Sequence, residues 1–581
     1  MRIRHLTMLL LLSTTLAGCE LPAAKTDVAA APTDAQVADA LMDTPSEAAD
    51  LSTLPVKDYI AAHFASSEHD SLEAAKYYRA ALESDPKNQD LVDAVFFSYS
   101  SGGDLDNAAR YAAKIVADDP SNRTARLVLA FVALKHHDFA GARKHLALMQ
   151  AGSFISPLFD AWTAAGTRDR KTIDADLAAL GSQGGAQDVA VFNRALILDL
   201  IGQTGSQTED AYQLALSQNP GNPRLVDAYG RYLERQGRAK DAEALYAKYA
   251  GNDGIAATVK VARARMASGK KPDRLVASAE AGAAEALASM AASLSSPDLA
   301  DTAIFYLRAS LYLRPDLDLA AVLLGSRYEV LKKYDDANAA YAQIKPDSPY
   351  YRMASIEMAL NEARLDRPDQ AIVKLKVLAD ASPTDIEIWT SLGDAYRSGE
   401  KYGDAASAYD HAIGQITKPD QQIWSLYYSR AIAREQNKDW PGAEADLKKA
   451  LEISPNEPQV LNYLGYSWIE KGQNLPDALA MLEKAKSLRP YDGYIVDSVG
   501  WAYYRLGRYD EAAQTLQTAV QLVPGDPTVN DHLGDALWRI GRKLDARFQW
   551  NHALSFNPEP EEKAGIEKKL QSGLTADDRR G

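Results

Sequence analysis

Near its C-terminal end the chain repeats a short pattern of small residues and prolines at an almost fixed interval. Four prolines mark the pattern, each closing a segment long enough for two helices: Pro455, Pro490, Pro524 and Pro558. Ahead of the third stand Gly500, Ala512 and Ala519, and these recur 34 positions later as Gly534, Ala546 and Ala553. A chain of 581 residues is too long for one globular core, whereas stacked units can extend it indefinitely.

The order of residues within one unit has a physical cause. The glycine of the first helix lets the second helix approach closely, and the alanines keep the line of contact thin. The proline ends the second helix because it lacks an N–H and its ring clashes with the preceding turn. Large apolar residues between these points, such as Tyr503 and Leu516, fill the space between helices. One unit cannot bury its own apolar face, so neighbouring units must stack.

This pattern resembles the tetratricopeptide repeat, a helix–turn–helix unit of about 34 residues that stacks into a superhelical solenoid. Further copies occur upstream, marked by Gly325 with Ala337, Gly393 with Ala405, Ala431 with Ala443, Ala74 with Ala81, and Gly230 with Ala242. The predicted fold class is therefore all-α, a solenoid of about a dozen such repeats.

Two stretches keep a helical periodicity but match the repeat poorly, residues 155–188 and 255–281. We interpret them as degenerate repeats, with inserted domains as the alternative. The expected organisation is an N-terminal array with degenerate units at 55–281, a C-terminal array at 282–558, and a terminal helix with a polar tail at 559–581.

The first residues have the order of a bacterial lipoprotein signal. Arg2 and Arg4 precede an apolar run at 6–12 that is too short to span a membrane. Residues 16–19, Leu-Ala-Gly-Cys, resemble a lipobox, which implies removal of residues 1–18 and acylation of Cys19. An ordinary secretory signal with a chance cysteine is the alternative.

Residues 19–54, which start at the lipidated Cys19, are rich in Ala, Thr, Pro and Asp, and this composition predicts a flexible tether. Cys19 is the single cysteine, so no internal disulfide can form. In lipoproteins of Gram-negative bacteria an aspartate after the cysteine often retains the protein in the inner membrane. Glu20 stands there instead, and we expect an outer-membrane protein, lipid-anchored and facing the periplasm.

The net charge and the sequence motifs restrict the classes of partner and of activity that we expect. The formal net charge of −15 argues against nucleic acid or a broad anionic membrane face as partners. No G-x-S-x-G, H-E-x-x-H or Walker sequence occurs. His136, His137 and His145 stand close together, but a solvated turn explains them better than metal ligation does. We therefore expect no enzyme activity, no metal and no cofactor.

In such repeats the first helices line the inner face of the solenoid. The offsets that face inward select ten candidate residues for a partner-binding groove: Asn462, Tyr466, Asp497, Trp501, Tyr504, Arg505, Asp531, Asp535, Trp538 and Arg539. Aromatic rings supply contact area and polar groups fix register, as recognition of an extended peptide or partner helix requires. Trp501 and Trp538 could equally fill repeat cores, in which case truncating them would lower stability.

Three strings resemble those of a proteobacterial group of tetratricopeptide outer-membrane lipoproteins: 461–468 (LNYLGYSW), 497–504 (DSVGWAYY) and 530–538 (NDHLGDALW). The group includes the lipoprotein binding partner of a carboxy-terminal processing protease. That resemblance covers roughly residues 282–558. It implies a solenoid that activates a periplasmic serine protease and presents peptidoglycan hydrolases to it as substrates.

The expected function is thus that of a non-catalytic adaptor tuning cell-wall hydrolysis. A structural scaffold for envelope assembly, in outer-membrane protein insertion or polysaccharide export, is the alternative. An enzyme with a hidden active site within 155–281 is a third hypothesis.

Overall fold

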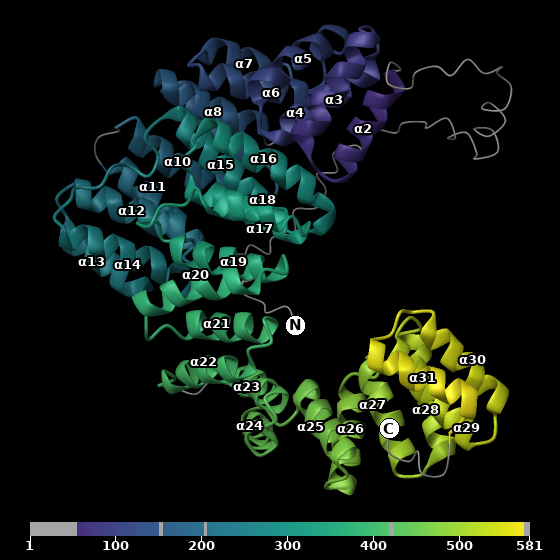
Figure 1. Cartoon of the computed structure of the whole chain (residues 1–581). Coiled ribbons are helices and arrows are strands. Elements are labelled where there is room, and N and C mark those ends of the chain that lie inside the picture. Colours follow the sequence, from purple (N-terminus) through teal and green to yellow (C-terminus); the bar gives the residue numbers. More distant parts are fainter. Residues whose placement is uncertain (1–54, 150–154, 203–205, 418–422, 575–581) are drawn as a thin grey trace, which may run out of the picture. The chain divides into compact units, whose positions relative to one another are not determined.

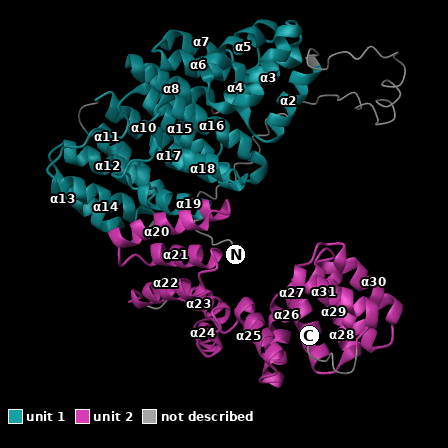
Figure 2. Ribbon diagram, viewed as in Figure 1, with its two compact units in different colours: residues 1–361 teal, residues 362–581 magenta. Residues whose placement is uncertain are grey.

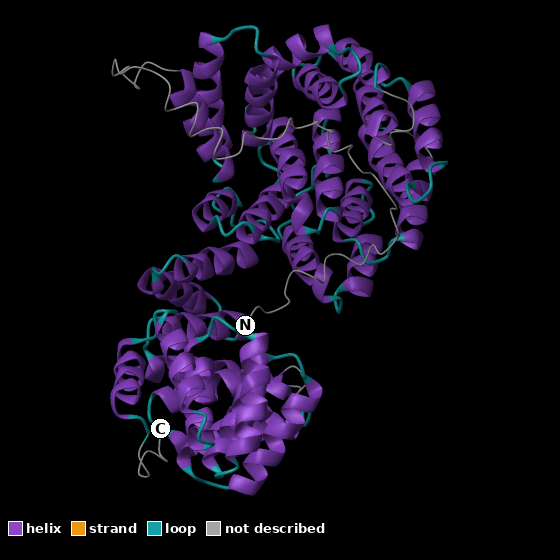
Figure 3. Cartoon of the chain, turned by 90° about the vertical axis from the view of Figure 1, so that its right-hand side faces the viewer, coloured by secondary structure: helices purple, strands orange, loops and turns teal. Residues whose placement is uncertain are grey.

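The computed structural model describes residues 55–149, 155–202, 206–417 and 423–574, and in these ranges the chain forms helices and no strands (Figures 1 and 3). The predicted all-α fold is confirmed. The signal, Cys19, the tether and the final tail residues lie outside the described ranges. Among the described helices, none is both long enough and apolar enough to traverse a bilayer.

The chain divides into two compact units, residues 1–361 and 362–581 (Figure 2). The first contains α2 (Pro55–Ser67), α3 (Ser71–Ser84), α4 (Gln89–Gly102), α5 (Leu105–Asp118), α6 (Arg123–Lys135), α7 (Phe139–Ala147), α8 (Ile155–Thr167), α9 (Arg170–Gly181), α10 (Gln187–Leu200), α11 (Gln207–Gln218), α12 (Pro223–Arg235), α13 (Ala239–Tyr249), α14 (Asp253–Ala267), α15 (Ala279–Ser293), a 3₁₀ turn (Pro297–Leu299), α16 (Ala300–Leu313), α17 (Asp318–Val330) and α18 (Tyr334–Tyr341). Helix α19 (Tyr351–Arg364) contains the boundary.

The second unit continues with α20 (Pro368–Ala381), α21 (Ile386–Ser398), α22 (Tyr402–Gly414), α23 (Trp424–Gln436), α24 (Trp440–Ile453), α25 (Pro458–Lys471), α26 (Leu475–Leu488), α27 (Gly493–Arg505), α28 (Tyr509–Leu522), α29 (Pro527–Arg539), α30 (Lys543–Leu554) and α31 (Pro560–Ser572). Successive helices from α21 to α30 pair as antiparallel hairpins, and so do most helices of the first unit.

Short polar residues set where the helices begin. Asp492 stands before α27, and its carboxylate accepts hydrogen bonds from the main-chain N–H groups of Tyr494 and Ile495. Within a hairpin, a residue with positive φ turns the chain, as at Gly507 (φ 76°) and Gly541 (φ 85°). Glycine adopts this conformation without the steric cost that a Cβ imposes.

The predicted glycine seam is present in both units. In several hairpins a glycine of the first helix lies directly against a large side chain of the second, so closely that a Cβ on the glycine would overlap it. These pairs are Gly230 with Tyr246, Gly325 with Tyr341, Gly393 with Tyr409, Gly500 with Leu516, and Gly534 with Trp550. The partner side chains are fully buried, which makes the seam the centre of each hairpin's core.

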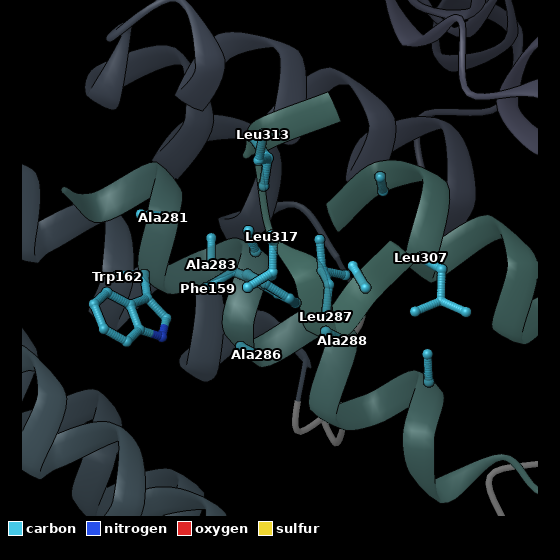
Figure 4. Close-up of a cluster of buried hydrophobic side chains, with 14 of the residues drawn as sticks. Phe159, Trp162, Ala281, Ala283, Ala286, Leu287, Ala288, Leu307, Leu313 and Leu317 are labelled. Carbon is cyan, nitrogen blue, oxygen red and sulfur yellow. The ribbon is translucent and has the colours of Figure 1, made fainter. Parts of the chain in front are cut away.

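In the first unit, a helix of the chain itself covers the row of first helices. Helices α15 and α16 pack against α4, α6, α8 and α10 (Figure 1). Helix α15 is rich in alanine and buried on nearly every side, as expected of a helix that is apolar all round. Figure 4 shows Trp162 of α8 beside Ala281 of α15. The ring also lies against Gly282, and its Nε1 donates to Asn193 Oδ1 at 2.8 Å.

Residues 155–188 and 255–281, which match the repeat poorly, have different structures. Residues 155–188 contain the hairpin α8–α9 and the start of α10, and their assignment as a degenerate repeat stays a prediction. Residues 255–281 form no hairpin: α14 packs on α12 and α13, and an irregular segment then leads into α15. The array boundary expected at 281/282 falls inside α15, whereas the compact units divide at 361/362. Helices α15 to α18 therefore belong with the first unit, because α15 and α16 pack into it.

We expect Gly282→Ala to destabilise the protein by about 1–3 kcal/mol, because its Cβ would overlap the buried Trp162 ring. Urea unfolding followed by circular dichroism measures this. Gly184→Ala is the matched control, since no atom lies near a Cβ there, and we expect a change within about 0.5 kcal/mol. Equal stability of the two variants would contradict the packing of α15 on α8.

Candidate protein-binding surface

The ten candidate residues lie on three consecutive first helices, α25, α27 and α29, which contact one another in sequence. Helix α31 follows in the position of the next first helix and packs on α30. All ten residues thus lie on first helices, as the sequence predicts, and their inward orientation stays a prediction. Their surroundings differ, however, and divide them into three groups.

Trp501 lies at the centre of the first group and is buried, with 4% of its surface exposed. Its ring stacks between Tyr504 at 4.7 Å and His532 at 4.0 Å, with interplanar angles of 8° and 12°. Its Nε1 donates to Glu470 Oε1 at 2.6 Å. The stacking joins α27 to α29, and the hydrogen bond to Glu470 joins α27 to α25. Trp501 and Tyr504 are thus core residues here, and any role in binding a partner stays a prediction.

Asp497 belongs to the same buried cluster. Both oxygens of its carboxylate lie 3.0 Å from Nδ1 of His532. Burial by itself lowers the pKa of His532, but the negative charges of Asp497, Asp531 and Asp535 outweigh burial and raise that pKa above its ordinary value. The sequence offered little signal for this histidine, because it stands one position away from the inward register.

The second group lies under the C-terminal helix. Lys569 of α31 donates to Asp531 Oδ2 at 2.6 Å and to Asp535 Oδ2 at 2.8 Å. Trp538 packs on Trp550 at 5.3 Å between ring centroids, and its Nε1 donates to the main-chain oxygen of Leu574 at 3.2 Å. Asp531, Asp535 and Trp538 therefore form the contact with α31 and are covered by it.

The two arginines are held by neighbours on the same surface. Arg505 donates from Nη1 to Glu470 Oε1 at 2.9 Å, and Arg539 donates from Nε to the Tyr504 hydroxyl at 3.2 Å. These bonds tie α27 to α25 and α29 to α27. Both side chains remain partly exposed, at the edge of the buried aromatic cluster.

Asn462 and Tyr466 of α25 form the third group and are partly exposed. Two tyrosines that the sequence interpretation missed extend the surface toward α23: Tyr428 and Tyr463 meet edge to face at 5.7 Å. Tyr428 precedes Asn462 by one repeat length, so the same register could have found it. Burial raises the pKa of Tyr466, and the negative charges of Glu470 and Asp497 raise it further. The hydroxyl of Tyr466 therefore stays neutral.

Two side-chain amides of α25 each have an oxygen with no hydrogen-bond donor among the described residues. Oε1 of Gln459 and Oδ1 of Asn462 are buried and accept no hydrogen bond from the part of the chain that the structure describes. A buried acceptor without a partner costs free energy. Together with the tyrosine rings of α23 and α25, these amides offer what an extended peptide needs: apolar area and hydrogen bonds for its main chain. We call Tyr428, Gln459, Asn462, Tyr463 and Tyr466 the α23–α25 surface.

The three histidines noted in the sequence each have a different partner. His136 Nε2 lies 3.3 Å from Asp106, His137 Nδ1 lies 2.7 Å from Glu280, and His145 Nδ1 lies 3.1 Å from Arg126 Nη1. Over the described ranges, no three side chains of the metal-ligating types gather in one place. The histidines thus serve contacts within the first unit.

Comparison with known protein families identifies tetratricopeptide repeats in two segments of the chain. Residues 500–541 match the model described as "TPR repeat", and residues 390–458 match the model described as "Tetratricopeptide repeat". The TPR repeat-containing protein PA4667 of Pseudomonas aeruginosa is 26% identical over 206 residues, which cover 35% of this chain and 34% of that protein. The general transcriptional corepressor ssn6 of Schizosaccharomyces pombe is 26% identical over 140 residues, or 24% and 12% of the two chains. The matches thus span about a third and about an eighth of these relatives.

Among solved structures, the Cut9–Hcn1 complex of the APC/C matches over 90% of this chain and 97% of its own, with 16% identity and a TM-score of 0.37. YrrB, a TPR protein with an unusual peptide-binding site, covers 33% of this chain and 97% of its own, with 18% identity and a TM-score of 0.27. Scores this low carry no functional inference. The repeat matches and the helical hairpins together make this chain an all-α tetratricopeptide-repeat solenoid, a fold that indicates protein partners.

We expect Trp501→Ala to destabilise the protein by about 3–5 kcal/mol, because the buried ring is lost from between Tyr504 and His532. Urea unfolding monitored by circular dichroism measures the loss. Tyr491→Ala, at an aromatic residue with 85% of its surface exposed, is the control and should change stability by less than about 0.5 kcal/mol. An unchanged unfolding midpoint for Trp501→Ala would place the ring in an open groove.

Lys569→Met should destabilise the contact between α29 and α31 by about 2–3 kcal/mol at pH 8, since Asp531 and Asp535 lose their cation. Burial, with the charge of Asp531, already raises the pKa of Asp535 to about 6, and losing Lys569 raises it further. A carboxylate whose folded pKa exceeds its unfolded pKa opposes folding as the pH rises.

The loss should therefore be smaller at pH 5 than at pH 8, as measured by thermal unfolding at both pH values. Lys568→Met, at an exposed neighbour, should show little change at either pH. A loss independent of pH would mean that Lys569 acts through packing alone.

Proposed function

We propose that this protein is a non-catalytic adaptor of the bacterial envelope that binds partner proteins at the α23–α25 surface. The observation that carries the proposal is a group of half-exposed tyrosine and amide side chains on the consecutive first helices α23 and α25, in which Tyr428 and Tyr463 meet edge to face. Tetratricopeptide repeats indicate protein–protein interaction, which supports an adaptor or scaffold role.

The partner we propose is a carboxy-terminal processing serine protease, with peptidoglycan hydrolases as the substrates brought to it. The support is the resemblance of residues 461–468, 497–504 and 530–538 to a group of tetratricopeptide outer-membrane lipoproteins that includes the binding partner of such a protease. The first of these strings contains Asn462, Tyr463 and Tyr466 of the α23–α25 surface. A scaffold for outer-membrane protein insertion or polysaccharide export is the competing role, and the same experiment distinguishes it.

We expect the full chain, carrying a C-terminal affinity tag, to retain a processing protease from a detergent extract of envelopes, as identified by mass spectrometry. Asn462→Ala combined with Tyr466→Ala should reduce the captured protease by about tenfold, equal to about 1.4 kcal/mol of binding free energy. Val373→Ala combined with Val377→Ala, at exposed residues of α20, is the matched control and should leave capture unchanged.

Matched melting temperatures of the two double variants would exclude unfolding as the cause. Capture of assembly or export components without a protease would contradict the proposed partner and favour the scaffold. Equal capture by both double variants would contradict the α23–α25 surface while leaving the partner intact.

We further propose that the protein is anchored in the outer membrane through acylated Cys19 and faces the periplasm. The lipobox-like residues 16–19 support this anchor. Cys19→Ser should move the protein from the membrane fraction to the soluble fraction and abolish incorporation of labelled palmitate, because the chain has no other cysteine to acylate. Retention of the variant in the outer membrane would contradict a lipid anchor.

A further inference from the structure

The first unit contains a cavity of about 260 Å³ at a meeting point of five segments. Its walls come from α12, α14, the irregular segment before α15, the turn between α16 and α17, and the turn before α19. All five segments lie within the first compact unit. The cavity is separate from the α23–α25 surface, and none of its lining residues belongs to that surface, so a ligand could occupy it whichever partner the surface binds.

Four arginines and five aspartates line the cavity, and carboxylates hold several of the arginines. Arg224 and Arg314 share one buried carboxylate, Glu285, with Nε of Arg224 at 3.2 Å from Oε2 and Nη1 of Arg314 at 3.3 Å from Oε1. Arg274 shares Asp199 with Arg235, which lies behind the wall. Glu285 and Asp199 thus each face two guanidinium groups, while Arg231 pairs with Asp227, which also lines the cavity.

Some N–H groups of Arg274 and Arg314 donate no hydrogen bond to a described residue. Among the described residues, Arg274 donates only from Nε, to the main-chain oxygen of Asp199 at 2.8 Å. Its two terminal nitrogens, which carry four N–H groups, have no acceptor there. Nη2 of Arg314 also has no acceptor among the described residues. Nε of Arg314 donates to Asp316, and its Nη1 donates to Leu275 and Glu285. Paired guanidinium N–H groups match the two oxygens of a carboxylate.

The exposed aspartates of the cavity, Asp316 and Asp347, lie at its rim, close to these arginines. Asp316 accepts a hydrogen bond from Nε of Arg314 at 3.3 Å, and Asp318 is partly buried. Burial raises the pKa of Asp318 above its ordinary value, so this carboxyl group would gain from a neighbouring cation. Leu275 and Pro349 add apolar area to the lining. A ligand with an oxyanion at one end and a cation at the other fits a lining that offers both spare guanidinium N–H groups and an exposed carboxylate.

We propose that this cavity binds a short zwitterionic peptide, with its carboxyl end on Arg274 and Arg314 and its amino group at Asp347. Inorganic phosphate shares the oxyanion chemistry, but its multiple negative charges would be repelled by the acidic rim. A dipeptide of small residues has the charges and the size for a cavity of this volume.

The test is isothermal titration of the full chain with four probes: alanyl-alanine, its C-terminal amide, its N-acetyl derivative and inorganic phosphate. We expect alanyl-alanine to bind, and the amide to bind at least about tenfold more weakly because it lacks the carboxylate. The N-acetyl derivative should also lose affinity, and phosphate should bind more weakly than alanyl-alanine. Equal binding of peptide and amide, or tighter binding of phosphate, would overturn the proposal, as would no binding of alanyl-alanine at millimolar concentration.

Variants place the ligand within the cavity. Arg274→Ala should weaken alanyl-alanine binding about tenfold, whereas Arg263→Ala should leave it unchanged. Arg263 is a sound control because its side chain is exposed to the same degree, at 41% against 42%, and it pairs with Glu243 outside the cavity.

A rim variant keeps the test valid if Arg274→Ala fails to fold. Asp347→Asn, at an exposed position, should weaken alanyl-alanine binding but leave the N-acetyl derivative unaffected, because only the former carries an ammonium group. Equal effects on both peptides would overturn the predicted orientation.

Discussion

The close approach of two helices at a glycine is the constraint on which the rest of this structure depends. Gly500 lies directly against Leu516, and Gly534 lies against Trp550, with no room for a Cβ. Because the hairpin is held closed at this point, its outer faces keep a constant shape, and the next hairpin can pack on them in the same way. Side chains at equivalent positions therefore line up on consecutive first helices, and the α23–α25 surface is part of such a row.

The two units use this alignment differently. In the first, α15 packs on α6, α8 and α10 and α16 packs on α4 and α6, so the chain itself covers that row. The alanine-rich sequence of α15 permits this because a thin helix can pack closely on every side. Buried charges accompany it: Glu285 of α15 holds Arg224 and Arg314 at the wall of the cavity. In the second unit the first helices contact one another directly, and their aromatic residues fill those contacts.

The candidate groove shows how far a repeat register predicts a binding site. Register alone placed Trp501, Asp535 and Asn462 on one face, and the structure does bring their helices together in order. Register does not specify whether neighbouring first helices lie close enough to bury that face. Trp501 stacks on His532 of the next helix, and Asp535 is covered by Lys569 of α31, so both are enclosed. Asn462 stays partly exposed, with its amide oxygen unpaired.

The sequence by itself determined the class of fold, the length of the repeat and the glycine seam, because all three follow from local spacing and from which residues permit two helices to touch. Its pattern also predicted the lipid anchor, which lies outside the described ranges. Only the tertiary structure decided that α15 turns back onto the first helices and that the compact units divide at 361/362. Only the tertiary structure, too, gathers arginines from α12, the segment before α15 and the turn after α16 around one cavity. These are contacts between residues far apart in the chain, and they depend on how hairpins curve and meet, which no local spacing encodes.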